Sequence, residues 1–235
     1  MGDVIVLITG ANRGIGFELA KQYLINGETV IATCRDKNRA TELISLKNKY
    51  SDKLLIESMD ISYPEQIERL ANKLIEQHIE IDLIVNNAGY LDRDNHSIHN
   101  INYANAEMSF KVNSLGPLFL THCFLPLMNK ARLSKIAIIS SVMGSLSQQQ
   151  SVAWYGYRMS KAAANMLAVN LSEELAIDNV AVVAIHPGWV QTDMGGTTAK
   201  ENVNDSSLGI MKVIDNLSIS STGTFYDFNS EELAF

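Results

Sequence analysis

The sequence has too few cysteines to build a disulfide framework. Cys34 and Cys123 are the only two among its 235 residues, and each lies in its own apolar stretch. We interpret them as buried free thiols, which suit a reducing compartment, and we therefore expect a cytoplasmic protein. The N-terminus enters an apolar stretch with no basic region before it, and Val6 stands where a myristoylation signal carries Ser or Thr. Neither a signal peptide nor a lipid anchor is expected.

Positive charge and long apolar runs are scarce as well. The formal net charge is -7 and the sequence has no run of Lys and Arg, which argues against a nucleic-acid-binding surface. No apolar run approaches the ~20 residues that a membrane-spanning helix needs. Hydrophobic residues nevertheless make up 46% of the chain, enough for a sizeable core and too many for a disordered chain. The length favours a single domain over residues 1–235.

Apolar stretches alternate with amphipathic ones along the whole chain. Val4–Thr9 is a continuous apolar run, which is typical of a strand buried on both faces. Further strands are predicted at residues 29–34, 54–58, 82–86, 135–141, 180–185 and 224–227. Helices are predicted at residues 15–26, 37–49, 64–77, 104–130, 155–178 and 206–217, with Gly116-Pro117 interrupting the fourth. This alternation predicts an α/β fold that is Rossmann-like and doubly wound, with a mostly parallel seven-stranded sheet and helices on both faces.

In such a sheet, ligands bind at the carboxyl ends of the strands. Four polar residues stand at these ends, namely Thr9, Asn86, Ser141 and His186. The loop over residues 88–103 also holds polar residues that could bind a metal, namely Asp92, Asp94, His96 and His99. Their spacing matches no common metal-ligand pattern, so we expect a solvated loop and no metal.

The first predicted strand runs into a glycine-rich turn. Gly10, Gly14 and Gly16 lie between this strand and the helix that follows. Gly10 permits a tight turn, and the other two permit close approach of the backbone to a ligand. The free N–H groups and positive dipole end of the next helix suit a pyrophosphate. The strand–turn–helix context makes this a candidate dinucleotide-binding turn, although its spacing is GxxxGxG rather than GxGxxG.

A second pattern places a phenol and an ammonium group on one helix face. Tyr157 and Lys161 are four residues apart in a stretch that is rich in Ala and Leu. A cation about 4 Å from the phenol contributes about 4 kcal/mol at an effective dielectric near 20, or roughly three pKa units. That would bring a phenol of pKa ~10 close to neutral pH, where proton transfer is most effective. Taken alone, this pair is better explained as a surface lysine beside a half-buried tyrosine, because pairs four residues apart are common on helices.

Together these patterns resemble the short-chain dehydrogenase/reductase family over nearly the whole chain. Seven motifs follow one another in the family's order: TGANRGIG at 9–16, Asp60-Ile61, Asn86-Asn87-Ala88-Gly89, Asn113, Ser141, Tyr157 with Lys161, and Pro187-Gly188 with Thr192. The segments WYGYRMSKAAANM and ATCRD are most similar to the branch of C-factor-like and Sniffer-like carbonyl reductases. One departure is the gap of 16 residues between Ser141 and Tyr157, about three more than in many members. The extra residues are expected in the loop at 144–152, and Ser140 is the fallback for Ser141.

The resemblance implies a role for each catalytic residue in the reduction of a carbonyl to an alcohol. Tyr157 would donate the proton, and Lys161 would lower the pKa of Tyr157 and bind the nicotinamide ribose. Ser141 would hydrogen-bond the carbonyl oxygen, and Asn113 would hold a water that links Lys161 to solvent. A tolerated polar residue in a helix remains the alternative for Asn113.

The resemblance also implies a set of residues that bind the cofactor. The set is Gly10, Asn12, Arg13, Gly14, Ile15, Gly16, Arg35, Asp60, Ile61, Asn87, Ala88, Gly89, Tyr157, Lys161, Pro187, Gly188, Val190 and Thr192. Within it, Asp60-Ile61 would contact adenine and Thr192 would hold the nicotinamide carboxamide. Arg35 stands where NAD-binding members carry an acid, and a planar guanidinium suits the 2′-phosphate of NADP. Arg13 adds a second positive charge, while Asp36 or a merely solvated Arg35 would weaken this argument.

The expected protein is thus an NADP(H)-dependent carbonyl reductase. Apolar residues near the catalytic set, namely Met143, Trp154, Trp189 and Met194, suit an apolar or aromatic substrate, although core packing explains each equally well. Residues 188–205 are expected to form a mobile loop over the substrate. The alternatives are an NAD-dependent alcohol dehydrogenase and a nucleotide-binding signalling protein of C-factor type. The long helices at 104–130 and 155–178 would pair subunits if the protein is a homodimer or homotetramer.

Overall fold

The computed structural model describes residues 4–94, 97–148 and 152–235, and in this part of the chain the strands form one parallel sheet. The strands lie in the order β3-β2-β1-β4-β5-β6-β7, and each neighbouring pair is parallel. Their bounds are β1 Ile5–Ile8, β2 Thr29–Cys34, β3 Leu54–Ser58, β4 Leu83–Asn86, β5 Ser134–Ile139, β6 Val180–His186 and β7 Phe225–Asp227. The predicted seven-stranded parallel sheet is therefore confirmed.

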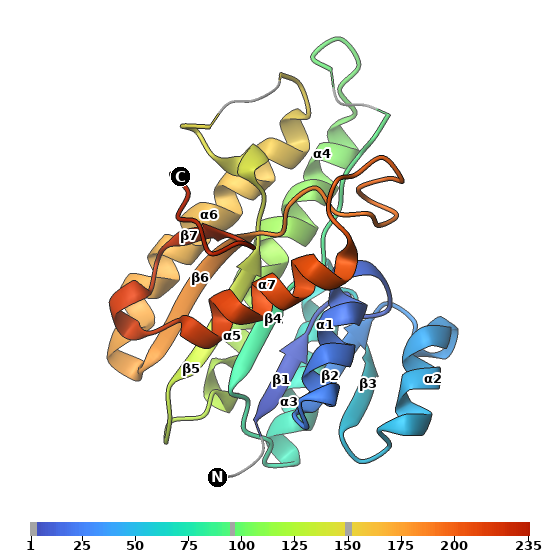
Figure 1. Cartoon of the computed structure of the whole chain (residues 1–235), viewed down its shortest axis with the longest axis vertical. Coiled ribbons are helices and arrows are strands. Elements are labelled where there is room, and N and C mark those ends of the chain that lie inside the picture. Colours follow the sequence, from blue (N-terminus) through green and yellow to red (C-terminus); the bar gives the residue numbers. More distant parts are fainter. Residues whose placement is uncertain (1–3, 95–96, 149–151) are drawn as a thin grey trace.

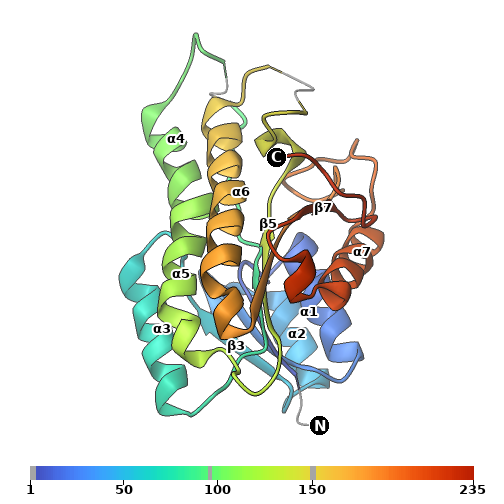
Figure 2. The ribbon, with the colours of Figure 1, turned by 90° about the vertical axis from the view of Figure 1, so that its left-hand side faces the viewer.

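Helices cover both faces of this sheet (Figures 1 and 2). On one face lie α1 Gly14–Ile25, α2 Thr41–Lys49 and α7 Val203–Asn216; on the other lie α3 Pro64–Glu76, α4 Tyr103–Phe110, α5 Gly116–Phe124 and α6 Tyr155–Leu175. Two apolar layers result, because successive strand residues point to opposite faces. In β1, Val6 and Ile8 pack toward α1, whereas Leu7 packs toward α3 and α5. Burial on both faces explains why the strands read as unbroken apolar runs.

The order of the strands reverses between β1 and β4. The chain winds outward through β2 and β3, then returns past β1 to continue through β4 to β7. The loops that follow β1 and β4 consequently diverge at the carboxyl edge of the sheet, where open α/β sheets bind their ligands. This edge carries the glycine turn after β1 and the segment 87–94 after β4. No helix within the described residues is long and apolar enough to cross a membrane.

A helical segment occupies most of the predicted range 104–130, but its irregular part lies at Lys111–Leu115 rather than at Gly116-Pro117. The chain forms α4, then a wider π-helical segment at Lys111–Leu115, then α5. The backbone stays in the right-handed helical region at Leu115 and Gly116, so Pro117 does not break the helix. Gly116 is required because a Cβ there would lie 2.7 Å from the backbone oxygen of Ile61. The π segment places Asn113 in an irregular turn of the kind found at functional sites.

Other element bounds differ from the prediction by a few residues. The segment predicted as a helix at 37–49 begins as a 3₁₀ turn, Lys37–Arg39, before α2. The fifth strand ends at Ile139, so Ser140 and Ser141 follow the strand rather than belonging to it. The last helix begins at Val203, three residues before the predicted start.

Candidate active site and dinucleotide cleft

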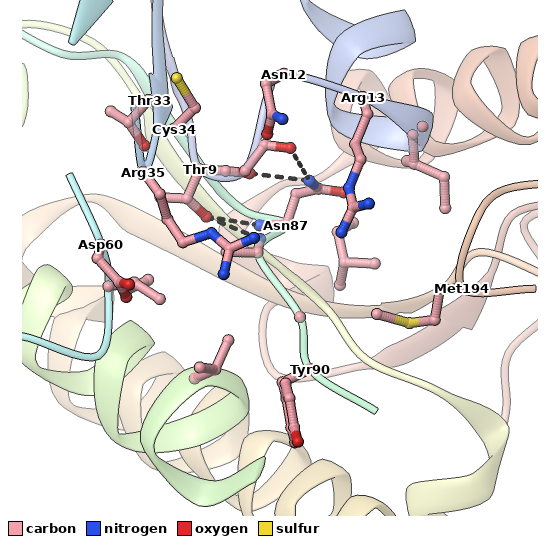
Figure 3. A pocket seen from close by; sticks show the side chains of 18 of the residues that line it. Thr9, Asn12, Arg13, Thr33, Cys34, Arg35, Asp60, Asn87, Tyr90 and Met194 are labelled. Atoms are coloured by element: carbon pink, nitrogen blue, oxygen red, sulfur yellow. Dashed lines mark hydrogen bonds between the residues drawn. The ribbon is translucent and has the colours of Figure 1, made fainter. Parts of the chain in front are cut away.

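A cleft of about 590 Å³ opens at the carboxyl edge of the sheet. Most of the predicted cofactor residues line it: Gly10, Asn12, Arg13, Gly14, Ile15, Arg35, Asp60, Ile61, Asn87, Ala88, Gly89, Tyr157, Lys161, Pro187 and Thr192. Figure 3 shows the side chains of Arg13 and Arg35 entering the cleft from the turn after β1 and from the end of β2. Motifs spread over the sequence are therefore brought to one site by the fold.

The glycine turn is shaped by close packing against the loop after β4. Gly10 has a φ of 64° and Gly14 a φ of 56°, a left-handed conformation that side chains rarely adopt. Gly16 does not line the cleft; a Cβ there would lie 2.4 Å from Nδ2 of Asn87. Its role is to let α1 approach the loop that follows β4.

The N-terminus of α1 presents unused hydrogen-bond donors to the cleft. Arg13 is the N-cap residue of this helix, and it makes no side-chain cap; no acidic residue lies in the first turn. Free backbone N–H groups and the positive end of the helix dipole suit an anionic group here. A turn that must be glycine, joined to an uncapped helix start, therefore fits the pyrophosphate of a dinucleotide.

The loop after β4 is tied to the glycine turn by Asn87 and Thr9. Asn87 Nδ2 donates to the backbone oxygens of Thr9 at 2.9 Å and Gly10 at 3.2 Å (Figure 3). The Thr9 hydroxyl accepts the backbone N–H groups of Asn87 and Ala88, each at 3.0 Å. Asn87 thus holds the turn in place while its neighbours line the cleft.

The end of the cleft next to β2 and β3 combines a carboxylate with a cation. Asp60 Oδ1 accepts hydrogen bonds from the backbone N–H of Ser62 at 2.9 Å and from its hydroxyl at 2.6 Å. Arg35 is exposed, and its guanidinium has no ion-pair partner within the described residues. A base could lie over Asp60 and Ile61, and a phosphate could reach Arg35.

Tyr157 and Lys161 line the inner part of the cleft, whereas Ser141 lies beside Tyr157 without lining it. Tyr157 and Lys161 share one face of α6, with Lys161 Nζ 5.7 Å from the centre of the Tyr157 ring. Lys161 Nζ donates to the backbone oxygen of Ile139 at 2.7 Å. The Ser141 and Tyr157 hydroxyls are hydrogen-bonded, and Ser141 Oγ also accepts the N–H of Met143 at 3.1 Å. The sequence pattern alone did not predict that the lysine would be anchored to the end of β5.

The pKa values of this pair differ from the prediction. Burial raises the pKa of Tyr157 to about 12, and the hydrogen bond with Ser141 only partly opposes this rise. Burial also lowers the pKa of Lys161 to about 8, because the charged ammonium loses its hydration. The expectation that Lys161 brings the pKa of Tyr157 near 7 is therefore wrong for this structure. Desolvation is the larger of the two causes, and with a pKa of about 12 Tyr157 is a protonated phenol at neutral pH.

The fallback Ser140 lines the cleft, but its hydroxyl is hydrogen-bonded away from Tyr157. Its Oγ donates to Asn165 Oδ1 at 2.5 Å, on the part of α6 beyond Lys161. Asn86 and His186, also expected at the chemical edge, do not line the cleft. Asn86 is buried with both side-chain polar atoms unpaired in the described part of the chain, and burial lowers the pKa of His186 to about 4.

Asn113 is hydrogen-bonded to the loop after β4. Its Oδ1 accepts the N–H of Tyr90 at 2.8 Å, and its Nδ2 donates to the oxygen of Tyr90 and the hydroxyl of Ser160, both at 2.9 Å. The Ser160 hydroxyl in turn donates to the backbone oxygen of Tyr157 at 2.7 Å. Asn113 does not line the cleft, and its side chain links the loop after β4 to the helix that carries Tyr157.

The segment after β6 lies across the cleft. Thr192 lines the cleft and approaches the glycine turn, since a Cβ on Gly14 would lie 3.2 Å from its Cγ2. Gly188 and Val190 do not line it: Gly188 has a φ of 86°, and Val190 is buried in a short bridge to Glu201. The bridge gives residues 188–205 a defined path, and their mobility stays a prediction.

The four apolar residues expected near a substrate lie in different places, and their contact with a substrate stays a prediction. Met194 lines the cleft, whereas Met143, Trp154 and Trp189 do not. Trp154 instead borders a separate small pocket beside Tyr157. Of the residues considered as metal ligands, His96 lies outside the described residues. Gln149 and Gln150, in the loop expected to hold the additional residues, also lie outside them.

Sequence reasoning missed several residues of the site. Tyr90 and Met108 line the cleft, and Arg93 contacts its rim, yet none belongs to a motif. Asp193 also lines the cleft, and only its place next to Thr192 could have drawn attention to it. Tyr90, Arg93 and Asp193 come from loops, where no periodicity marks a position, and Met108 lies on α4 outside any motif.

Comparison with known proteins shows the family. Residues 4–203 match the model of the family described as short chain dehydrogenase. The chain is 32% identical over 225 residues to a 1-hydroxy-2-glutathionyl-2-methyl-3-butene dehydrogenase of Rhodococcus sp. (strain AD45), covering 94% of each chain. It is 39% identical over 153 residues to C-signal of Myxococcus xanthus, covering 65% of this chain and 92% of that protein. The crystal structure of NADPH-bound carbonyl reductase from chicken fatty liver superposes with a TM-score of 0.91 at 33% identity, covering both chains completely.

The protein belongs to the short-chain dehydrogenase family and is an oxidoreductase of that family. The predicted likeness to C-factor-like proteins and carbonyl reductases is confirmed by these relatives. The particular reaction, substrate and cofactor are matters of proposal.

Proposed function

We propose that this protein reduces a carbonyl compound, an aldehyde, ketone or quinone, to an alcohol with NADPH. The observation that carries the proposal is the hydrogen-bonded pair of Tyr157 and Ser141 hydroxyls beside the buried Lys161, in a cleft that begins at an uncapped helix start. The Tyr157 phenol lines the cleft and the Ser141 hydroxyl lies next to it, so a carbonyl oxygen bound at Tyr157 could accept from both hydroxyls. When bound, the nicotinamide supplies the hydride.

Each side chain has a task that its environment suits. Tyr157 is a phenol with a pKa of about 12, so it carries the proton at neutral pH that the reduced oxygen must receive. Ser141 donates a hydrogen bond to the same oxygen and stabilises the negative charge that develops there. Lys161, with a pKa of about 8, is mostly charged at pH 7 and stabilises the tyrosinate left after proton transfer. Asn113 acts as a positioning residue that joins the loop after β4 to the start of α6.

Arg35 supports NADPH as the cofactor. Its exposed guanidinium stands at the end of β2, at the side of the cleft that holds Asp60. A guanidinium binds a phosphate through two parallel hydrogen bonds. The 2′-hydroxyl of NADH carries no charge and cannot accept this pair of hydrogen bonds. The 33% identical carbonyl reductase that contains NADPH is consistent with this assignment.

Two alternatives rest on the other relatives. The Rhodococcus protein is named a dehydrogenase, which favours an alcohol oxidation with NAD as a second candidate. The likeness to C-signal keeps a signalling role with little turnover as a third. Neither role requires a buried Lys161 next to hydrogen-bonded Tyr157 and Ser141 as strongly as carbonyl reduction does. Pairing of subunits into a homodimer or homotetramer stays a prediction.

The test is NADPH consumption with a panel of aldehydes, quinones and dicarbonyls, run with the wild type, Tyr157→Phe and Tyr155→Phe. Tyr155 is a matched control, because it lies on the same helix and is 40% exposed. We expect turnover in the wild type and Tyr155→Phe and a loss of at least about 100-fold in Tyr157→Phe, which lacks the proton donor. NADPH binding should be kept in both variants.

Substantial turnover by Tyr157→Phe would show that another group donates the proton. Tight NADPH binding by the wild type without turnover on any carbonyl would favour the signalling role. Faster alcohol oxidation with NAD than carbonyl reduction with NADPH would favour the dehydrogenase.

A further inference from the structure

The segment after β6 places the carboxylate of Asp193 next to Arg13 of the glycine turn. Thr192, Asp193 and Met194 line the cleft. Arg13 Nη1 lies 2.7 Å from Asp193 Oδ2, although the two residues are 180 positions apart in the sequence. Arg13 belongs to the glycine turn, so this ion pair bridges the two sides of the cleft.

The backbone of this segment is held independently of that carboxylate. Arg93 Nη2 donates to the backbone oxygens of Asp193 and Met194. The Thr192 hydroxyl accepts the N–H of Gly195 at 3.1 Å, and Trp189 Nε1 donates to the oxygen of Gly195 at 2.8 Å. The Asp193 carboxylate has the Arg13 ion pair as its contact, and its side chain is 74% exposed. Changing that carboxylate should leave the path of the segment intact.

The pair sets two anions in competition for one cation. A dinucleotide with a 2′-phosphate places extra negative charge in a cleft that Arg13 and Arg35 both line. To bind that phosphate through Nη1, the donor that Asp193 now holds, Arg13 has to release Asp193. Because both charges of the existing pair are exposed, the competition is moderate and reversible.

We propose that Asp193 is a specificity-determining residue that weakens binding of the 2′-phosphate by holding Arg13. This inference rests on the proposed use of NADPH. With Asp193 present, the ratio of NADPH affinity to NADH affinity should be smaller than it would be if Arg13 and Arg35 were both unpaired. Removing the Asp193 carboxylate should increase that ratio.

The experiment measures the dissociation constants of NADPH and NADH by nucleotide fluorescence, without any carbonyl substrate. The proteins are the wild type, Asp193→Asn, Asp193→Glu, Arg13→Gln and the double variant with Arg13→Gln and Asp193→Asn. Exposed ion pairs shift equilibria by about two- to fivefold. We expect Asp193→Asn to bind NADPH about two- to fivefold more tightly and NADH unchanged, and Asp193→Glu to resemble the wild type.

The double variant separates competition for Arg13 from a general charge effect. If Asp193 acts through Arg13, Asp193→Asn has no effect on NADPH binding once Arg13 is Gln. Equal tightening with and without Arg13, equal tightening of NADPH and NADH, or no change in Asp193→Asn would each overturn the inference. A thermal melt of each variant confirms that all five proteins are folded.

Failure of this inference is distinguishable from failure of the proposed function. If carbonyl reduction is wrong, the wild type binds NADPH but turns over none of the carbonyls, and the binding comparison still stands. If only the role of Asp193 is wrong, carbonyl reduction proceeds and Asp193→Asn binds both nucleotides as the wild type does.

Discussion

Replacing Lys161 with Met is expected to change how the stability of the protein depends on pH. Lys161 is 4% exposed, and burial lowers its pKa from 10.5 to about 8. Between these two values the unfolded chain holds a proton on this lysine that the folded chain has released. Since the unfolded state then binds more protons, the free energy of unfolding increases as pH rises through this window. The contribution is therefore unfavourable below pH 8 and fades toward pH 10.5.

The size of the effect follows from the pKa difference. Each pKa unit corresponds to about 1.4 kcal/mol, so the buried ammonium costs about 3 kcal/mol at pH 7 and about 1 kcal/mol at pH 9.5. Relative to Lys161→Met, the wild type should therefore gain about 2 kcal/mol of unfolding free energy over this interval. The variant also leaves the Ile139 oxygen without its partner, which changes the offset between the curves but not their slopes. Tyr157 is present in both proteins, so its own raised pKa cancels.

The assay is urea denaturation at several pH values between 7 and 9.5, followed by tryptophan fluorescence without nucleotide. Lys212→Met is the matched control, because it removes one positive charge from an exposed position on α7. Its stability curve should run parallel to that of the wild type, whereas the curve of Lys161→Met should diverge from both. Parallel curves for the wild type and Lys161→Met would refute the argument that burial depresses the pKa of Lys161.

Two further substitutions test the cofactor cleft. Arg35→Ala should weaken NADPH binding by at least about tenfold, the effect of losing a hydrogen bond to a charged group, and leave NADH binding nearly unchanged; titration of both nucleotides measures this, and equal weakening would contradict the assignment of Arg35 to the 2′-phosphate. Gly16→Ala should abolish binding of both nucleotides and lower the melting temperature, since the new Cβ would lie 2.4 Å from Asn87 Nδ2 and 2.6 Å from the Gly10 oxygen. A comparison with Gly27→Ala, which has open space around the new Cβ but also a φ of 87°, separates the packing clash from backbone strain.

Much of the cleft could be predicted from local sequence. The glycine turn, the loop after β4 and the residues Tyr157 and Lys161 are each marked by a short run of sequence. A parallel sheet then brings the ends of β1, β4 and β5 to one edge whatever the intervening loops contain. For this reason a list of motifs in chain order predicted most residues that line the cleft.

The positions of Asn113 and Asp193 could not be obtained in that way. The wide turn that carries Asn113 arises where Gly116 packs against Ile61, a contact between residues that are 55 positions apart. Asp193 meets Arg13 only because the segment after β6 folds back over the turn after β1. Contacts of this kind join residues that are far apart in the chain. Loops of many different lengths could form them, so no periodicity or fixed spacing in the sequence marks the residues involved.

The alternation of apolar and amphipathic segments was sufficient to predict the seven parallel strands, their helices and the edge that binds ligands. It also sufficed for the pairing of Tyr157 with Lys161, because a helix places residues four apart on one face. The protonation behaviour of that pair depended on the packed fold. In the sequence, the two side chains attract each other as charges in a polar medium. In the structure, burial removes their hydration, which raises the pKa of Tyr157 and lowers that of Lys161, and desolvation is a property of the surroundings rather than of the pair.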